Sequence, residues 1–246
     1  MDITLLYEDA DIVAIDKPSG LMTHPDGRTK LETASDWFAS AYPDSKTVGE
    51  TQRLQNGEEI LRPGVVHRLD TDTSGVLIFA KTPEAHAFYK EVFQNHTAKK
   101  TYLAFVYGVP KEKKGIIEFA IGRSSKDFRL RSAQPKAKGT LREAITKWEV
   151  VSDIKTHSLI KAMPETGRTH QIRVHLKAIH HPIVCDPLYA PKHPHNLGFT
   201  RLGLHAYQLT LPLLHGGEIT LTSPVPGDLL PALKKFPNTE QFLAPK

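Results

Sequence analysis

Short apolar runs separated by polar turns are the main pattern along this chain. Residues 3–7 and 12–15 are two such runs around the polar turn 8–11, and they predict an N-terminal hairpin. Residues 76–80 form a continuous apolar run, which is typical of a buried strand. Residues 101–108 place one apolar set on each face, which predicts a strand buried on both sides or nearly so.

The second half of the chain repeats this strand pattern. Residues 144–151 and 158–162 predict a strand pair, and residues 202–211 and 218–221 predict closing strands. Residues 43–64 are rich in Gly, Glu, Gln and Asn and show no periodicity, so they predict a surface loop.

Helical signals occur between these strands. Residues 31–42 predict a helix that Pro43 ends. Thr82, Pro83 and Glu84 together form a strong helix start, because a hydroxyl cap precedes a proline and an acid in the first turn. This second helix should continue to about residue 95.

A third helix is predicted from its cap and its apolar stripe. Thr169 is the expected N-cap, and the helix should continue to about His180. Its apolar stripe consists of Ile172, Leu176 and Ile179. Arg173 lies at the edge of this stripe, where its stem can be buried while its charged head reaches into a cleft. Helices among strands joined by short turns predict an α+β fold with a largely antiparallel sheet.

Composition narrows the class of protein. With 246 residues, 39% of them hydrophobic and 24% charged, the chain has the composition of a globular protein with a substantial core. No apolar run approaches the roughly 20 residues of a membrane helix, and the N-terminus has no export signal. Cys185 is the only cysteine, which excludes an internal disulfide. We therefore expect a cytoplasmic protein without membrane contact.

The charge distribution points to a polyanionic partner. The net charge is +5, from 32 Lys and Arg and 27 Asp and Glu residues. Between residues 123 and 142 only Asp127 opposes a run of cations, which is either a solvated loop or a phosphate-binding segment. The cations of this segment are Arg123, Lys126, Arg129, Arg131, Lys136, Lys138 and Arg142.

The strongest candidate for chemistry is a carboxylate in front of the apolar run 76–80. Asp70 lies in the sequence His67-Arg68-Leu69-Asp70-Thr71-Asp72-Thr73-Ser74-Gly75. A charge beside a core strand is unfavourable unless it is paired or hydrogen-bonded. An Asp at such a place, among hydroxyls that can fix the loop, indicates either a functional group or a turn that merely starts a strand.

These residues carry a resemblance to a known family. His67-Arg68-Leu69-Asp70-x-x-Thr73-Ser74-Gly75 resembles the active-site motif of the RluA-type pseudouridine synthases. Four further segments resemble motifs of the same family in the same order, from about residue 3 to residue 226. They are Lys17-Pro18-Ser19-Gly20-Leu21, Lys99-Lys100-Thr101-Tyr102-Leu103-Ala104, Thr166-Gly167-Arg168-Thr169-His170-Gln171-Ile172-Arg173-Val174-His175-Leu176 and Arg201-Leu202-x-Leu204-His205-Ala206.

The resemblance implies a single catalytic domain over residues 1–246, without the extra N-terminal RNA-binding domain of some members. It implies the pseudouridine synthase fold, with a catalytic cleft across the sheet. It also implies an activity, the isomerisation of specific uridines in rRNA or tRNA to pseudouridine by a monomer that needs no cofactor. The alternative is a catalytically silent RNA-binding protein on the same fold.

The resemblance also implies roles for single residues. Asp70 is the catalytic carboxylate, and attack on C1′, addition to the base and proton abstraction from C2′ all remain open. Arg173 is the expected ion-pair partner of Asp70, with Arg168 as the competitor. Arg168 lies in the loop before the helix, where a cation reaches phosphate more easily, and it is assigned to substrate binding. Tyr102 would stack on the flipped uracil and handle a proton.

Three more residues are assigned to substrate binding. Arg68 would fill the space that the flipped nucleotide leaves, Leu204 would form an apolar wall of the uracil pocket, and His67 belongs to the same motif. No metal site is expected, because His170 and His175 lie about 140° apart around a helix. The chain has no metal-binding motif of the H-E-x-x-H or C-x-x-C type and no glycine-rich phosphate loop.

Overall fold

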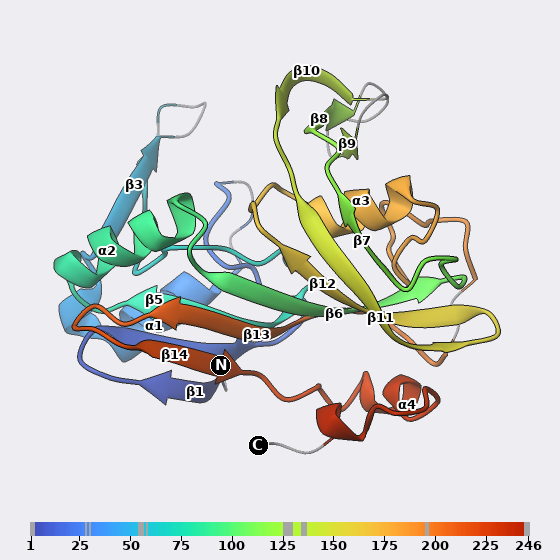
Figure 1. The fold of residues 1–246 in the computed structure, drawn as a ribbon. Helices are drawn as coiled ribbons and strands as arrows, with labels where there is room; N and C mark the ends of the chain where they lie inside the picture. Colours follow the sequence, from blue (N-terminus) through green and yellow to red (C-terminus); the bar gives the residue numbers. More distant parts are fainter. Residues whose placement is uncertain are drawn as a thin grey trace. The chain divides into compact units, whose positions relative to one another are not determined.

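The computed structural model describes residues 3–27, 29, 31–53, 57, 59–124, 130–133, 137–194 and 197–243. The chain divides into two compact units, which are labelled by element in Figure 1. The first unit contains Met1–Lys99 and Gln208–Ser223, and the second contains Lys100–Tyr207 and Pro224–Lys246.

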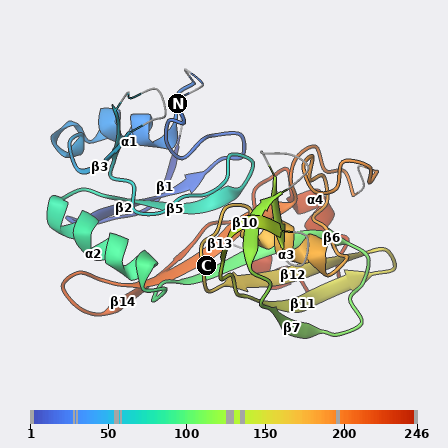
Figure 2. The same cartoon turned by 90° about the horizontal axis from the view of Figure 1, so that it is seen from above.

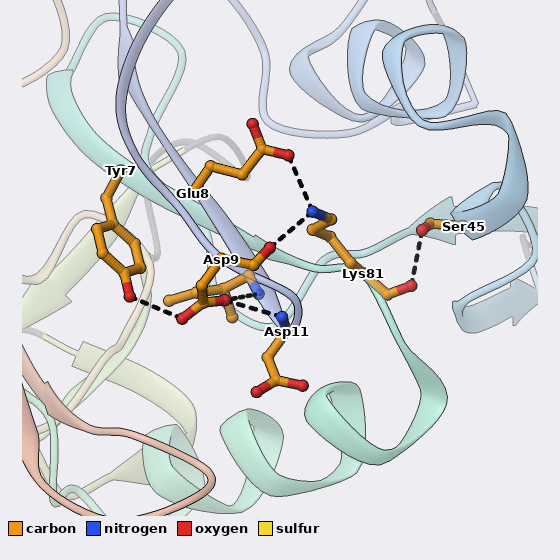
Figure 3. Close-up of polar contacts among 7 residues, drawn as sticks. Tyr7, Glu8, Asp9, Asp11, Ser45 and Lys81 are labelled. Carbon is orange, nitrogen blue, oxygen red and sulfur yellow. Dashed lines mark hydrogen bonds and ion pairs between the residues drawn. The ribbon is translucent and has the colours of Figure 1, made fainter.

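The first unit starts with the expected hairpin of β1 (Thr4–Glu8) and β2 (Ile12–Lys17). Its turn is closed by Asp9, whose Oδ1 accepts hydrogen bonds from the backbone of Asp11 and Ile12 at 2.8 and 2.7 Å. Lys81 holds the turn from outside, because its Nζ donates to Glu8 Oε1 at 2.9 Å and to the Asp9 carbonyl at 2.7 Å (Figure 3). The hairpin prediction is therefore confirmed.

Two helices cover the two faces of the sheet that β2 forms with β5 (Ser74–Ala80) (Figure 2). Helix α1 (Ala34–Ala41) stacks Phe38 on Phe79 with ring centroids 5.0 Å apart. Helix α2 (Pro83–Gln94) packs on the opposite face, where its buried residues join those of both strands in one cluster. The cluster contains Ile12, Ala14, Val76, Ile78, Ala80, Ala85, Tyr89 and Val92. Side chains of a strand alternate between its two faces, and here a helix covers each face. For this reason β5 is buried at every position.

In the first unit, the local signals for the helix starts hold with one adjustment. Thr82 caps α2 through a bond from the Ala85 amide, as predicted. Helix α1 starts at Ala34 rather than at residue 31, because Thr33 and Asp36 form a capping box.

The loop predicted over residues 43–64 is wrong. After the short 3₁₀ helix η1 (Pro43–Ser45), β3 (Gly49–Arg53) and β4 (Glu59–Pro63) form an antiparallel pair. Most residues of this pair are exposed or half-buried, so the pair has no apolar alternation that a sequence pattern could reveal.

The predicted closing strands are β13 (Leu204–Pro212) and β14 (Glu218–Thr222), which pair antiparallel from Gln208 onward. The part of β13 before Gln208 belongs to the second unit, and the rest belongs to the first.

The second unit is built on an antiparallel sheet in the order β6, β12, β11, β7. The bounds are Lys99–Tyr107 for β6, Lys114–Ile117 for β7, Thr146–Ile154 for β11 and His157–Pro164 for β12. Helix α3 (Gln171–Ala178) packs on the face of Ala104 and Val106. The C-terminal segment, with α4 (Leu230–Leu233) and η2 (Glu240–Phe242), packs on the face of Leu103 and Phe105. The prediction that this strand is buried on both sides is confirmed.

The basic segment of the second unit forms a small sheet of its own, in the order β10, β8, β9. Strand β8 is Ile121–Ser124, β9 is Arg131–Ala133 and β10 is Ala137–Arg142. The described part of this segment is therefore sheet and not a loop, while Lys126, Arg129 and Lys136 lie outside the described residues.

The strand pairs named above are antiparallel, and helices pack beside them. This arrangement is an α+β fold. None of the helices in the described ranges is long and apolar enough to cross a membrane.

Candidate active site

Asp70 lies in the loop that leads into β5, as the sequence predicts, and it is half-buried. The loop turns directly after it, because the Thr73 amide donates to the Asp70 carbonyl at 3.1 Å. Leu69 before it and Thr73 after it are buried. Two buried neighbours therefore anchor the loop on both sides of a carboxylate that is itself only half-buried.

An N-terminal segment holds the backbone of this loop. The Thr23 hydroxyl donates to the Leu69 carbonyl at 2.9 Å and accepts from the Leu69 amide at 3.2 Å, with both residues buried. The Gly20 amide donates to the Thr71 carbonyl at 2.8 Å, and Gly20 has a positive φ of 87°. These bonds fix the residues immediately before and after Asp70.

Two side chains of the same segment complete the clamp. Lys17 is fully buried, and its Nζ donates to the carbonyls of Leu21 at 2.7 Å, Pro18 at 2.9 Å and Thr71 at 3.1 Å. The Ser19 hydroxyl donates to the Asp72 carbonyl at 2.7 Å. A buried ammonium needs such acceptors to offset its desolvation, so Lys17 ties its own strand end to the loop.

The other predicted residues of the loop differ in exposure. His67 is half-buried, stacks on Phe93 at 4.3 Å between ring centroids, and accepts at Nε2 from the Ile78 amide at 3.0 Å. Arg68 is exposed. Burial, with smaller effects from the charges of Arg68 and Arg62, lowers the pKa of the nearby His24 to about 4. The main cause is that burial removes solvent from the charged imidazolium.

In the second unit, Arg173 is almost completely buried, with 2% of its surface exposed. Its Nε and Nη2 donate to the two carboxylate oxygens of Asp186, both at 2.8 Å. This is a bidentate pair in which neither partner reaches solvent.

Asp186 is itself held in place. Its Oδ1 accepts from the amides of Leu188 and Tyr189, both at 2.9 Å. The Arg173 guanidinium also lies over the Tyr189 ring, 5.2 Å from the centroid. The orientation of Arg173 is therefore fixed by a carboxylate, two amides and an aromatic face.

Gln171 docks α3 on the sheet. Its Oε1 accepts from the Thr166 hydroxyl at 2.7 Å and from the Arg168 amide at 3.0 Å. Its Nε2 donates to the Ile145 carbonyl at 2.9 Å and to the Thr146 hydroxyl at 3.0 Å. Arg173 follows two residues later on the same helix. The bonds of Gln171 therefore also fix the part of the helix from which the buried Arg173 side chain projects.

The predicted cap of this helix is wrong. Helix α3 starts at Gln171, and its N-cap is His170, in a left-handed conformation with φ of 57° and without a side-chain cap bond, rather than Thr169. The Gln171 side chain instead holds the loop before the helix by accepting the Arg168 amide, which is a contact that spacing alone does not reveal.

Tyr102 and Leu204 are brought together in the second unit. Leu204 is buried in the cluster that Ile172 and Leu176 of α3 form with β6 and β12, and the half-buried Tyr102 packs against this cluster. Arg168 is half-buried and points elsewhere, because its Nε donates to the Glu143 carbonyl at 2.9 Å.

Lys100 lies on the same side of β6 as Tyr102. Its Nζ donates to the carbonyls of Glu165 and Thr166 at 3.3 and 3.4 Å. Burial lowers the pKa of Lys100 to about 8. No group of three or more potential metal ligands lies together in the part of the chain that the structure describes.

Comparison with known proteins decides the family. A family model described as RNA pseudouridylate synthase matches residues 11–178, which include the Asp70 loop, Tyr102 and Arg173. The chain belongs to this family. Leu204 lies outside the matched range.

Curated relatives agree with this assignment. An uncharacterized RNA pseudouridine synthase of Synechocystis sp. is 38% identical over 225 residues, which are 91% of this chain and 66% of the relative. Another uncharacterized RNA pseudouridine synthase, from Chlorobaculum parvum, is 36% identical over 95% of this chain and 74% of its own length. The ribosomal large subunit pseudouridine synthase D of Nitrosomonas europaea is 36% identical over 96% of this chain and 67% of its own length. The chain thus spans about two thirds to three quarters of these relatives.

Solved structures support the fold. Human RNA Pseudouridylate Synthase Domain Containing 4 matches with a TM-score of 0.73 and 24% identity over 99% of this chain and 95% of that chain. Human RNA Pseudouridylate Synthase Domain Containing 1 matches with a TM-score of 0.70 and 24% identity over 92% and 84%. The predicted pseudouridine synthase fold is therefore confirmed.

Sequence reasoning missed several residues that shape this synthase. Asp186, Tyr189 and Gln171 hold or dock the segment that carries Arg173. An Asp followed closely by a Tyr is no signal of an ion pair by itself. A buried Arg on an amphipathic helix does require a carboxylate, so the search for a partner of Arg173 could have included Asp186.

Thr23→Val should loosen the Asp70 loop. The variant keeps the shape but leaves the buried amide and carbonyl of Leu69 without their partner, which should cost about 1–3 kcal/mol of unfolding free energy. Exchange of the Thr73 amide should accelerate. Urea unfolding and hydrogen exchange measure the two effects. Thr210→Val is the control, since it removes only a bond to Thr220 on an exposed sheet face. Equal effects of both changes would contradict the clamp.

Lys100 should make stability depend on pH above neutrality. Burial lowers its pKa from the ordinary 10.5 to about 8, so between these values the unfolded chain binds more protons than the folded protein. The wild type should therefore gain on the order of 2 kcal/mol relative to Lys100→Met from pH 7 to pH 10. Urea unfolding at both pH values measures this gain. Lys99→Met, which removes an exposed lysine from the same strand, is the control. If Lys99→Met and Lys100→Met had the same dependence of stability on pH, burial would not be the cause.

Proposed function

We propose that this protein is an RNA pseudouridine synthase that isomerises uridine in rRNA or tRNA, with Asp70 as its catalytic carboxylate. The observation that carries the proposal is the backbone clamp around Asp70, within the segment that matches the family model. A clamp of this kind fixes the backbone from which the carboxylate projects, and a fixed position is what a reaction at a single nucleotide needs.

The reaction is an isomerisation, so its atoms balance within the substrate. The bond between N1 and C1′ breaks, the uracil turns, a bond between C5 and C1′ forms, and the proton on C5 moves to N1. No redox step and no donor group is needed, which supports an enzyme that acts without a cofactor. Attack of Asp70 on C1′, its addition to the base and proton abstraction from C2′ each require an ionised carboxylate close to the ribose.

The remaining residues have proposed supporting roles. Arg173 pairs with Asp70 and keeps it ionised, and Asp186 acts as the positioning residue that orients the guanidinium. Tyr102 stacks on the uracil and handles the proton from C5, and Leu204 forms an apolar wall beside it. In this proposal the two units act as one catalytic domain.

Substrate entry is assigned to the loop before Asp70. Arg68 is exposed, so it can enter the space that the flipped nucleotide leaves. His67 keeps Arg68 in place through its bond to β5, while Arg168 reaches a phosphate near the second unit. We further propose that the protein works as a monomer in the cytoplasm.

Ribosomal RNA is the first substrate to test, because relatives are named ribosomal large subunit pseudouridine synthase D. Purified protein is incubated with an unmodified large-subunit rRNA transcript and, separately, with tRNA transcripts, and pseudouridines are mapped. New pseudouridine in either RNA is the expected result. Binding without any pseudouridine would favour the catalytically silent RNA-binding protein instead.

Asp70→Asn should lower the single-turnover rate by at least about 10²-fold while RNA affinity stays close to that of the wild type. The amide retains the shape and the backbone clamp but loses the charge and the nucleophile. Asp72→Asn, two residues later, is the matched control and should stay active. A single-turnover rate of Asp70→Asn close to that of the wild type, in protein free of wild type, would refute the catalytic assignment.

Arg173→Lys should lower the turnover rate strongly, because a point-charge ammonium cannot reproduce the bidentate fork that holds Asp186. In this proposal the same guanidinium also pairs with Asp70. Single-turnover rates are compared per folded protein, since the change also disturbs a buried pair. Arg168→Lys is the control and should affect RNA affinity more than rate. The reverse outcome, with Arg173→Lys active and Arg168→Lys inactive, would assign the ion pair to Arg168.

A further inference from the structure

The small sheet of the second unit aligns three cations across its three strands. Arg123 of β8 lies directly opposite Arg131 of β9 and directly opposite Lys138 of β10. Directly opposite residues of antiparallel strands project to the same face, with Cβ atoms about 4.5–5.5 Å apart. The three side chains therefore form a continuous row, which we call the cationic row.

Within the described part of the chain, no ion pair neutralises any of the three cations of the row. Arg123 and Lys138 are exposed, and Arg131 is half-buried. Like charges directly opposite each other destabilise a sheet, so the alignment is unfavourable unless an anion is bound to it.

The face that carries the row also contacts the helix of Arg173. Ile121 and Ala133 are a directly opposite pair two positions away from the Arg123 and Arg131 pair, so they share its face. Both are buried in a cluster with Val174 of α3. One end of this face thus packs on α3, and the other end presents the cations.

A hydrogen bond fixes the row to the Arg173 site within the same unit. The Arg131 amide donates to the Tyr189 hydroxyl at 2.9 Å, and the Tyr189 ring lies under the Arg173 guanidinium. The same hydroxyl contacts His170 Nδ1 at 2.9 Å. The row therefore stands at a fixed place relative to Arg173 and is not an independent surface charge.

We propose that the cationic row of Arg123, Arg131 and Lys138 binds consecutive phosphates of the RNA strand that is delivered to the Arg173 site. Neighbouring strands lie about 4.8 Å apart, so three strands place three cations over about 10 Å, a length that suits a short run of phosphates along one strand. The contact is with the backbone and is independent of base identity. This inference rests on the proposed function, because it takes RNA as the substrate.

The test compares two triple variants that remove the same charge. Arg123→Gln/Arg131→Gln/Lys138→Gln removes the row, and Lys111→Gln/Lys155→Gln/Lys234→Gln removes three exposed lysines elsewhere in the second unit. Each variant removes three positive charges from the formal net charge of +5. Affinity for a large-subunit rRNA transcript is measured over a range of salt concentrations.

The row variant should weaken binding most at low salt and reduce the slope of log affinity against log salt by about 2 to 3, at roughly 0.7–0.9 for each phosphate contact. The lysine variant should change the slope much less. The single-turnover rate at saturating RNA should be unchanged in both, because the row touches phosphates and not the reacting uridine. The melting temperature of the row variant should not fall, since the change relieves repulsion between aligned charges.

Equal slopes for the two variants would overturn the inference, and so would a wild-type slope in the row variant. The proposed function is tested separately by the wild type in the same assay. If the wild type binds the transcript but forms no pseudouridine, the catalytic proposal fails while the row is still judged by its salt slope.

Discussion

The burial of the Arg173 charge is the constraint on which the second unit depends. A guanidinium that is 2% exposed needs a partner, and Asp186 supplies two hydrogen bonds of 2.8 Å. Asp186 in turn needs the amides of Leu188 and Tyr189, so the segment after it must turn back on the carboxylate. Removing one partner of such a buried pair typically costs about 3–5 kcal/mol, because the other charge is left uncompensated. The position of Arg173 is therefore determined by the fold around it.

In the first unit, hydrogen bonds to the backbone hold the loop that carries the half-buried Asp70. Thr23 holds the residue before it, while Gly20 and Lys17 hold the carbonyl of Thr71 after it. Because these bonds end on main-chain atoms of the loop, they constrain its path on both sides of Asp70.

Charge distribution connects these local solutions to the proposed substrate. Arg68 stands exposed beside Asp70 in the first unit, and the cationic row stands beside the Tyr189 and Arg173 site in the second. Each unit thus combines one group proposed for chemistry with exposed cations nearby. In this proposal, the cations bind RNA through its phosphates, and the groups proposed for chemistry select the uridine. Proteins commonly divide the recognition of backbone and base in this way.

The sequence by itself determined the elements whose signals are local, such as the Thr82 cap and the two-faced strand over residues 101–108, and it marked Asp70 through a short motif. It missed the polar β3 and β4 hairpin, because exposed strands carry no apolar alternation. Only the tertiary structure decided the partners: Thr23 meets Leu69 across 46 residues, and Arg173 meets Asp186 across 13. Such contacts have no period along the chain, because they depend on where folding brings distant segments together, and a hydrogen bond forms only at short distance and in the right orientation.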